Sequence, residues 1–421
     1  MRFTAALAVA AATIGSAAAQ DSMILGFNSG ASTDTGVAKT QADFEKEFKT
    51  AQNLNGAPGK FNAIRLYSNI QWETKDTPIA AFPAAIATNT KLLLGIWASG
   101  TDNIDSELNA LTAAVEKYGT KLTDLVIGLS IGSEDLYRVS EVGIKNKSGV
   151  GNDAETIVKF IKDARKRLAD TPLSGVRITH VDTADAWVNT SNKAVIDEID
   201  FLAVNAFPFY ESERANGIQE AGKLLASGIE KAEAAAGDKE LWITETGWAY
   251  KGPDFGAAKA TVDNAETYWK DVGCALFGKR NVFWYTLRDA NPANKVKFAI
   301  TEDLSTTPRF DLSCPKEKKE LPSADSDSDS DSGSDSDSKH NSTSTGGSSH
   351  GASSGSNSTI GTGSNSTSTG INGTGSTGAQ PTASNAAPPE STGAGAFISV
   401  SMTNAMAMGL SVVFAAAAWA L

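Results

Sequence analysis

Histidine and cysteine are scarce in this sequence: the 421 residues include three histidines and two cysteines. Between residues 20 and 315, which we expect to form the folded part, His180 is the sole histidine. A zinc site needs several His, Cys or acidic ligands, and a Ser–His–Asp triad needs its own histidine. Both chemistries are therefore nearly excluded. Acid–base catalysis must come from carboxylates, and we expect no metal or other cofactor.

Basic residues are also fewer than acidic ones. The chain has 37 Lys and Arg residues against 49 Asp and Glu residues, which gives a formal net charge of −12. Six of the negative charges fall in one Asp-Ser alternation between Asp325 and Asp337. An acidic balance of this kind argues against a nucleic-acid partner. The folded part also lacks a G-x-G-x-x-G turn and a P-loop, so nothing indicates nucleotide binding.

Apolar runs that suggest targeting lie near the two ends. Residues 1–19 have one basic residue, an apolar run and the small residues Ala17-Ala18-Ala19, as in a signal peptide cleaved after Ala19; a first membrane helix is the alternative. Small residues at 393–395 are followed by a moderately polar spacer and an apolar tail with no basic residue after it, the layout of a signal for a glycosylphosphatidylinositol (GPI) anchor over 394–421. We expect attachment at Gly393, with Asn385 as second choice and a permanent membrane span as the alternative. The protein would then be exported to the plasma membrane and cell wall.

Residues 316–393 contain almost no apolar side chain. Such a segment cannot bury enough surface to offset the entropy of folding, so we expect a disordered, glycosylated stalk rich in Ser, Thr and Gly. Its Asp-Ser run has no glycine at the sixth position and no terminal glutamate, both of which a calcium loop needs. Sequons for N-glycosylation occur here and in the folded part, at Asn146, Asn189, Asn341, Asn357, Asn365 and Asn372.

The two cysteines, Cys274 and Cys314, both lie late in the folded part. In an exported protein such a pair most simply forms one disulfide, which would fix the C-terminal end of the domain.

Short apolar runs recur between residues 23 and 287, and helical patterns separate several of them. Eight runs have the length and β-branched content of strands buried on both faces: MILGFN, FNAIRLY, KLLLGIW, DLVIGLSIG, GVRITHV, IDFLAVNAF, ELWITET and NVFWYTL. Helical spacing of apolar residues marks 102–118 and 153–169; Phe44 and Phe48 mark another helix, and 213–236 reads as a long one. Eight alternating units predict a (β/α)8 TIM barrel over 20–315, and a doubly wound open sheet is the competitor.

In such a barrel, functional residues collect where the strands end. Two carboxylates stand there, Glu134 after the fourth strand and Glu245 at the end of the seventh. A retaining glycosidase needs two carboxyl groups about 5–5.5 Å apart, and strands four and seven face each other across the mouth. Amide and aromatic side chains stand at the same strand ends, and the aromatic faces offer flat apolar surfaces on which sugar rings can pack. The substrate-binding residues that we expect are Arg65, Tyr67, Trp97, Ser133, Asn205, Phe207, Trp248 and Trp284.

Four motifs, IRLYS, IGSEDLYR, VNAFPFY and ITETGW, occur in that order on the second, fourth, sixth and seventh expected strands. Together they resemble family 17 glycoside hydrolases, and among these the fungal GPI-anchored endo-β-1,3-glucanases. The resemblance implies a (β/α)8 fold, Glu134 as proton donor, Glu245 as nucleophile, retention of configuration and no metal. Ser133 stands where the family commonly has Asn, and Phe207 where a tyrosine often orients the nucleophile.

The predicted function is hydrolysis of internal β-1,3-glucosidic bonds in cell-wall glucan by a monomer. Two alternatives remain at this point. A β-1,3-glucanosyltransferase would use the same two carboxylates and pass the sugar to another glucan hydroxyl. A non-catalytic glucan-binding wall protein is the second alternative, and the presence of both Glu134 and Glu245 argues against it.

Overall fold

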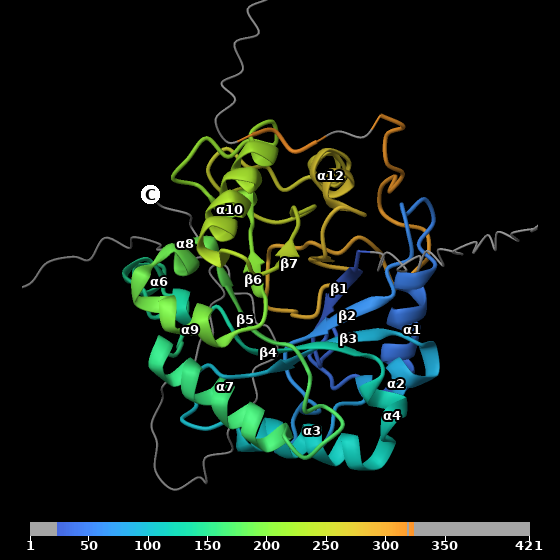
Figure 1. The fold of residues 1–421 in the computed structure, drawn as a ribbon. Coiled ribbons are helices and arrows are strands. Elements are labelled where there is room, and N and C mark those ends of the chain that lie inside the picture. The colour runs from blue at the N-terminus through green and yellow to red at the C-terminus, as the bar shows by residue number, and fades with distance from the viewer. Residues whose placement is uncertain (1–22, 318–319, 324–421) are drawn as a thin grey trace, which may run out of the picture. The chain divides into compact units, whose positions relative to one another are not determined.

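The computed structural model describes residues 23–317 and 320–323. Eight parallel strands pair in sequence order, and β1 also pairs with β8, so the sheet closes into a barrel. Figure 1 shows the helices arranged around the outside of these strands. The (β/α)8 prediction is therefore confirmed. The strands are β1 (Leu25–Ser29), β2 (Ala63–Leu66), β3 (Lys91–Ile96), β4 (Val126–Ser133), β5 (Ile178–Thr183), β6 (Leu202–Asn205), β7 (Leu241–Thr246) and β8 (Val282–Trp284).

The helices of the described residues vary from single turns to 16 residues. They are α1 (Gln41–Gln52), α2 (Ala81–Thr88), α3 (Asp105–Tyr118), α4 (Thr120–Thr123), α5 (Asp135–Arg138), α6 (Glu141–Lys145), α7 (Ala154–Leu168), α8 (Ala184–Val188), α9 (Lys193–Glu198), α10 (Ala221–Ala236), α11 (Val262–Tyr268) and α12 (Cys274–Leu276), with short 3-10 turns at Thr190–Asn192 and Pro208–Tyr210 and a π-helical turn at Trp269–Gly273.

The longer helices form where apolar residues recur at helical spacing. In α7 the apolar side chains at that spacing are fully buried, and Asp153 caps the helix by accepting a hydrogen bond from the Thr156 N–H. The expected helix over 213–236 is shorter, because residues 213–220 form turns and α10 begins at Ala221. The Asn216 amide holds these turns by donating to the carbonyls of Pro208, Phe209 and Phe255.

Two apolar clusters hold the fold together. A large one joins the strands to the surrounding helices. A small one contains side chains that come almost entirely from the strands, so it fills the lower interior of the barrel. Its members are Ala63, Leu93, Val181, Phe201, Ala203, Trp242 and Phe283. Side chains two residues further along these strands, such as Arg65, Asn205 and Thr244, face the same interior, closer to the carboxyl ends.

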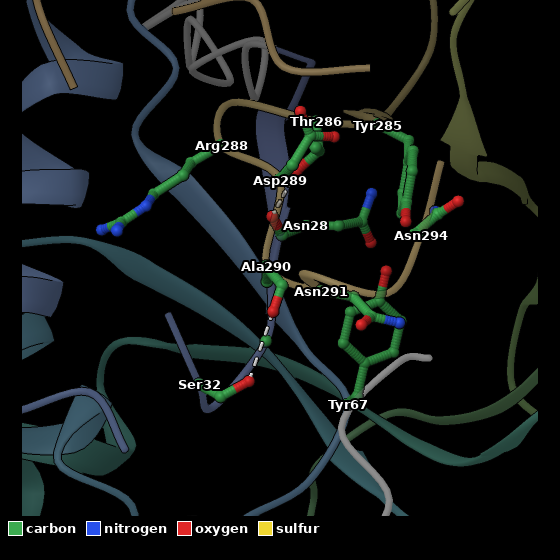
Figure 2. Close-up of a pocket in the computed structure, with 11 residues that line it drawn as sticks. Asn28, Ser32, Tyr67, Tyr285, Thr286, Arg288, Asp289, Ala290, Asn291 and Asn294 are labelled. Carbon is green, nitrogen blue, oxygen red and sulfur yellow. Dashed lines mark hydrogen bonds between the residues drawn. The ribbon is translucent and has the colours of Figure 1, made fainter. Parts of the chain in front are cut away.

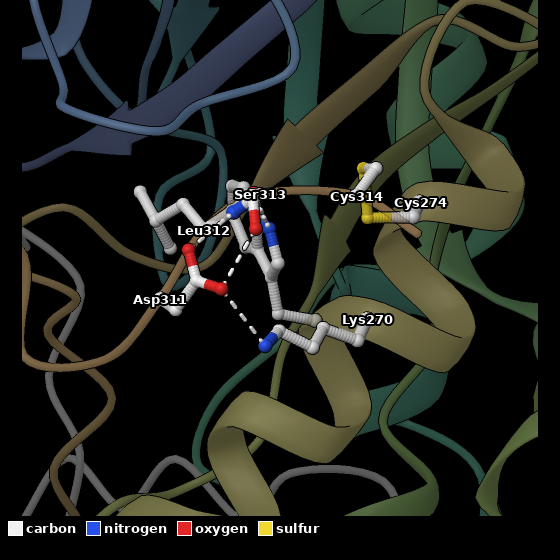
Figure 3. The surroundings of a disulfide bond; sticks show 7 residues. Lys270, Cys274, Asp311, Leu312, Ser313 and Cys314 are labelled. Carbon is white, nitrogen blue, oxygen red and sulfur yellow. Dashed lines mark hydrogen bonds and ion pairs between the residues drawn. A yellow bond between two sulfur atoms is a disulfide. The ribbon is translucent and has the colours of Figure 1, made fainter. Parts of the chain in front are cut away.

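The C-terminal part of the domain is fixed by the disulfide between Cys274 and Cys314, the pairing expected from the sequence (Figure 3). Beside it Lys270 on the π-helical turn binds Asp311, at 3.0 Å. The described contacts continue past residue 315: Lys279 binds Glu320 at 3.0 Å, and Leu321 packs against the large cluster. The ordered domain therefore reaches a few residues beyond the predicted boundary.

Candidate active site

Glu245 lies near the end of β7, and two side chains hold its carboxylate. Arg65 is on β2, and Tyr67 directly follows β2. Arg65 donates from Nη1 to Oε1 of Glu245, and the Tyr67 hydroxyl donates to the same oxygen at 2.8 Å. Arg65 is 1% exposed and Glu245 is 7% exposed. Burial and the charge of Glu245 raise the pKa of Tyr67 well above its usual value, so this hydroxyl stays protonated. The two hydrogen bonds fix the orientation of the Glu245 carboxylate.

Glu134 follows β4 directly and has a left-handed backbone conformation, with φ 60° and ψ 24°. A non-glycine residue rarely adopts this conformation, and such residues cluster at functional sites. The Asn205 amide donates to Oε1 of Glu134 at 3.0 Å, and an Arg138 nitrogen lies 3.7 Å from Oε2. Glu134 is therefore held from β6 on one side and from α5 on the other.

The pKa of Glu134 is raised to about 7. Burial is the main cause, and the charge of Glu245 adds to the rise, while the charge of Arg138 and the hydrogen bond from Asn205 oppose it. The two carboxyl groups thus lie in different environments: Glu245 is hydrogen-bonded to a guanidinium and a tyrosine, whereas burial dominates at Glu134 and raises its pKa. This is the division expected between a nucleophile and a general acid.

Two hydrogen-bonded routes link each carboxyl group to the chain neighbour of the other. Thr244, the neighbour of Glu245, donates to the Asn205 side-chain oxygen at 2.9 Å, and Asn205 in turn binds Glu134. On the other side, Arg65 donates from Nη2 to the Ser133 hydroxyl at 2.9 Å. Both routes are buried or partly buried, so the relative position of Glu134 and Glu245 is determined by the barrel itself.

Asn28 on β1 completes the support of Arg65. Its side-chain oxygen accepts from Nη1 of Arg65 at 2.9 Å, and its amide donates to the Thr244 carbonyl at 3.0 Å. Asn28 thus links β1, β2 and β7 at the level of the two carboxylates.

His180 and Asp182 lie on β5, towards the end of the strand. His180 Nε2 and the backbone N–H of Leu136 both contact Oδ2 of Asp182, each at 2.9 Å. Burial alone would lower the pKa of His180, but hydrogen bonding to Asp182 and the charges of Asp182 and Asp135 raise it overall. Since Leu136 belongs to α5, this pair fixes the turn that presents Glu134.

An open pocket of about 510 Å³, a volume that includes open solvent, is lined by Asn28, Tyr67 and residues after β8 (Figure 2). Tyr67, which binds Glu245, and Tyr285, which follows β8, both line it. The remaining wall comes from β1, the residues that follow it and the segment after β8. Its residues are Asn28, Gly30, Ser32, Thr286, Arg288, Asp289, Ala290, Asn291 and Asn294.

Trp97 lies on the side of Glu134. Its ring is half-buried, its indole N–H donates to the Ser99 carbonyl at 3.1 Å, and the Arg138 guanidinium lies 5.9 Å from its ring centre. Glu107 on α3 fixes this corner, because its carboxylate accepts from Ser68 Oγ at 2.6 Å, Asn69 N at 2.8 Å and Trp97 N at 3.2 Å.

Two of the expected substrate-binding residues are corrected by the structure. Trp248 and Trp284 are each 2% exposed. Trp248 donates to the Lys259 carbonyl and packs on Phe209 and Tyr268, while Trp284 packs on the aromatic residues of the α11–α12 region. Both rings lie in the layer between strands and helices, so neither can form the wall of a sugar subsite. Phe207 is 5% exposed, and its ring supports Tyr285 from behind at 5.5 Å.

Sequence reasoning missed three contributors to the site. Arg138 was detectable, because it stands four residues after Glu134, the spacing at which side chains meet on a helix. Asn28 also stands at a strand end, but only the fold shows that it binds Arg65. The segment after β8 shows no helical or strand periodicity in its apolar residues, so the sequence did not predict that it lines the pocket.

The described residues contain two of the six sequons. Asn189 is exposed, whereas Asn146 is half-buried and donates to the Tyr137 hydroxyl at 3.2 Å. The predicted sites at Asn341, Asn357, Asn365 and Asn372, and the attachment residue Gly393, lie outside the described residues. Within the described ranges, no group of three His, Cys, Asp or Glu residues could hold a metal ion. No helix in the part that the structure describes is long and apolar enough to cross a membrane.

Comparison with known proteins gives three findings. A family model described as the BtgE/BtgC glycoside hydrolase domain matches residues 26–300. The chain is 49% identical over 316 residues to a probable glucan endo-1,3-beta-glucosidase of Aspergillus fumigatus, which covers 75% of this chain and 70% of that protein. It is 29% identical to a glucan 1,3-beta-glucosidase of Saccharomyces cerevisiae, over 66% of this chain and 84% of that protein.

Among solved structures, the chain is similar to a family 17 β-1,3-glucanosyltransferase from Rhizomucor miehei. The TM-score is 0.52 at 22% sequence identity, and the match covers 68% of this chain and 98% of that one. At this level of identity the likeness concerns the fold alone.

Proposed function

Because the chain belongs to the BtgE/BtgC glycoside hydrolase family, we propose that it hydrolyses internal β-1,3-glucosidic bonds of cell-wall glucan with retention of configuration. The substrate is supported by the relatives that are named for this activity, at 46–49% identity over most of the folded part. The observation that carries the catalytic assignment is the contrast between the two strand-end carboxyl groups. Glu245 contacts the Arg65 guanidinium, and the pKa of Glu134 is raised to about 7.

In the proposed reaction Glu134 protonates the bridging oxygen while the Glu245 carboxylate attacks the anomeric carbon. The glycosidic bond breaks, the aglycone leaves with the proton, and an ester forms between Glu245 and the sugar. Glu134, now ionised, takes a proton from water, and the resulting oxygen nucleophile displaces Glu245. Arg65 and Tyr67 orient the nucleophile in both steps, and Asn205 orients the acid.

Product analysis on reduced laminari-oligosaccharides tests the reaction type. Hydrolysis gives products shorter than the substrate. Products longer than the substrate would mean that the sugar passes to another glucan hydroxyl, and the absence of any product would contradict the catalytic proposal. Proton NMR in the first minutes tests the stereochemistry: the β-anomer should appear first, and an early α-anomer would mean that Glu245 acts as a general base instead.

We further propose that the protein is a monomer, held at the cell surface by a GPI lipid at Gly393 and exported through a signal peptide. The observation that supports the anchor is the group of small residues at 393–395 with the apolar segment after them. Membrane-bound protein should become soluble on treatment with a phosphatidylinositol-specific phospholipase. Resistance together with detection of a peptide from 396–421 would favour a membrane span.

A further inference from the structure

His180 and Asp182 form a buried pair on the outer face of β5, between the strand and the helices. Val181, which separates them, belongs to the small cluster inside the barrel, so its two neighbours face the helical layer. Trp187 on α8 packs edge-on against the histidine ring, with the ring centres 5.7 Å apart. Both members of the pair are 0% exposed. Bulk water cannot reach their polar atoms, so protein groups must satisfy them.

The Asp182 carboxylate accepts backbone hydrogen bonds on both oxygens. Its Oδ1 accepts from the Thr183 N–H at 2.8 Å, and its Oδ2 accepts from the Leu136 N–H at 2.9 Å. Hydrogen bonds of this kind favour the ionised carboxylate. An ionised carboxylate has no proton to donate, so the 2.9 Å contact between Oδ2 and His180 Nε2 needs a proton on the histidine nitrogen.

The other ring nitrogen of His180 also faces an acceptor. Nδ1 lies 2.6 Å from the backbone carbonyl oxygen of Ile131, which can only accept. A neutral imidazole has one protonated nitrogen and could satisfy only one of these two contacts, whereas the doubly protonated ring satisfies both. Burial lowers the pKa of His180, but hydrogen bonding to Asp182 and the charges of Asp182 and Asp135 outweigh it and raise the pKa overall.

The pair lies directly behind the turn that presents Glu134. The Glu134 backbone N–H donates to the carbonyl of Val181, between the two members of the pair, at 2.8 Å. Ile131, which the histidine binds, precedes the turn, and Leu136, which the aspartate binds, follows it. Glu134 has φ 60°, a conformation that a non-glycine residue keeps only when its surroundings enforce it. The pair therefore holds the chain on both sides of this residue.

The charges around the pair balance when the histidine is protonated. Asp135 on α5 lies close enough for its charge to act on His180, and its Oδ1 accepts from Ser99 Oγ at 2.6 Å. Arg138 on the same helix donates to that Ser99 oxygen at 2.9 Å. Two buried anions, Asp135 and Asp182, are thus matched by two buried cations, Arg138 and His180. A neutral histidine would leave one of the anions without a counter-charge, which is costly in a buried layer.

We infer that His180 is an imidazolium at neutral pH and a positioning residue for the proposed acid: its charge fixes Asp182 and, through it, the turn that brings Glu134 to the leaving oxygen. The inference rests on the proposed function, which assigns the acid role to Glu134. Loss of the imidazolium should misplace the acid. The nucleophile is held from the side of β2 and should keep its position.

Nitrogen NMR measures the charge directly. In His340→Gln/His350→Gln, His180 is the sole histidine left in the sequence, so isotopic labelling of histidine reports its two ring nitrogens alone. Both should carry a proton at about pH 7, above the ordinary histidine pKa of about 6.5. Asp182→Asn in this background removes the counter-charge and should give the neutral ring, whereas Asp170→Asn, an exposed control, should not. A neutral ring in the parent, or a doubly protonated ring in Asp182→Asn, would overturn the inference.

Two substrates test the consequence for catalysis. The leaving group of laminarin is a sugar oxygen that needs a proton from the acid, whereas the dinitrophenolate of an aryl β-laminaribioside is weakly basic and needs little help. His180→Gln should lower kcat/KM on laminarin by roughly 100-fold, the cost of misplacing a catalytic group by about 1 Å. The fall on the aryl substrate should be smaller by a factor of roughly 10 or more. Asp170→Asn should change neither rate.

An equal fall on both substrates would overturn the inference, because His180 would then support the whole site and not the acid in particular. An unchanged rate on laminarin would overturn it as well. If His180→Gln does not fold, Asp182→Asn, which keeps the shape of its side chain, takes its place in the same assay with the same expected results. Failure of the proposed function is distinguishable, since the wild type would then leave laminarin intact whatever the nitrogen spectrum shows.

Discussion

Arg65 is the residue on which the geometry of the site depends most directly. It is almost fully buried, and its guanidinium contacts Glu245, Ser133 and Asn28. A guanidinium has five donors in a fixed plane, so it can hold three partners at defined angles where a lysine could not. The carboxylate that it holds is the one proposed to attack the sugar.

Glu245→Gln should reduce kcat by at least about 1,000-fold with little change in the fold, because an amide has nearly the shape of the carboxylate and none of its charge. Glu240→Gln is the matched control, since Glu240 is exposed immediately before the other end of the same strand. The assay is laminarin hydrolysis by purified protein, with circular dichroism to check folding. A variant that kept a tenth of the wild-type rate would show that Glu245 is not the nucleophile.

The pH profile should reflect Glu134. The acid must be protonated to donate, so kcat/KM should fall as the pH rises through about 7, the raised pKa of this group. Asn205 donates to the carboxylate and so lowers that pKa. In Asn205→Ala the alkaline limb should therefore move to higher pH, in addition to any loss of rate. If the alkaline limb moved to lower pH instead, a group other than Glu134 would be responsible for the fall of kcat/KM at high pH.

At this scale the sequence predicted the two carboxylates and their neighbours Arg65, Tyr67 and Asn205, because each stands at the end of an apolar strand. It misplaced Trp248 and Trp284 for the same reason. Position at a strand end does not tell which face a side chain takes, and irregularities in strand pairing between Ile243 and Thr246 alter the simple alternation there. The burial of both rings required the fold.

Among the secondary-structure elements, α3 has a role beyond covering the barrel. Its Glu107 accepts hydrogen bonds from the residues that follow β2 and from Trp97 after β3. The helix thereby joins two strand ends that both contribute to the cleft.

Glu107→Ala should lower the free energy of unfolding by about 2–3 kcal/mol, because three buried donors lose their acceptor and each unsatisfied donor costs about 1–3 kcal/mol before relaxation. Urea unfolding measures this. Glu116→Ala, on the exposed face of the same helix, should change the value by less than about 0.5 kcal/mol. Equal changes in the free energy of unfolding for the two variants would mean that the Glu107 hydrogen bonds do not stabilise the fold.

The elements themselves were largely predictable. Apolar runs of strand length marked all eight strands, and helical spacing marked α1, α3 and α7. The predicted 213–236 helix starts too early, because α10 begins at Ala221. Asn216 instead binds backbone carbonyls of Pro208 and Phe255, and helical periodicity does not reveal such contacts. Periodicity reports which face is buried and not which backbone groups a side chain will bind.

Across the whole molecule, the disulfide between Cys274 and Cys314 connects the helical layer to the segment that leaves the domain. It closes a stretch with a sequence separation of 40 residues. A double Cys274→Ser/Cys314→Ser variant should lose about 2–4 kcal/mol of stability through the larger freedom of its unfolded chain. Thermal unfolding with and without reductant checks this, and the wild type in reductant should approach the variant. A reductant-insensitive wild type would contradict it.

The four motifs predicted the family correctly, and the relatives support the predicted glucanase function. The closed barrel was predictable because its eight repeating units are each local in sequence. The pocket wall was not, since it brings together Asn28 and Asn291, which are far apart in the chain and meet only because β1 and β8 close the barrel.

Two buried guanidiniums stand beside the two carboxyl groups, Arg65 with Glu245 and Arg138 with Glu134. In the proposed reaction, one negative charge resides on Glu245 before the first step and faces Arg65. Once Glu245 becomes an ester and Glu134 has given up its proton, that charge resides on Glu134 and faces Arg138. The second displacement returns it. The enzymatic cycle therefore keeps the total charge of the cleft constant, and one anion merely alternates between two fixed cations. Turnover of a neutral polysaccharide by such a cleft should depend little on ionic strength.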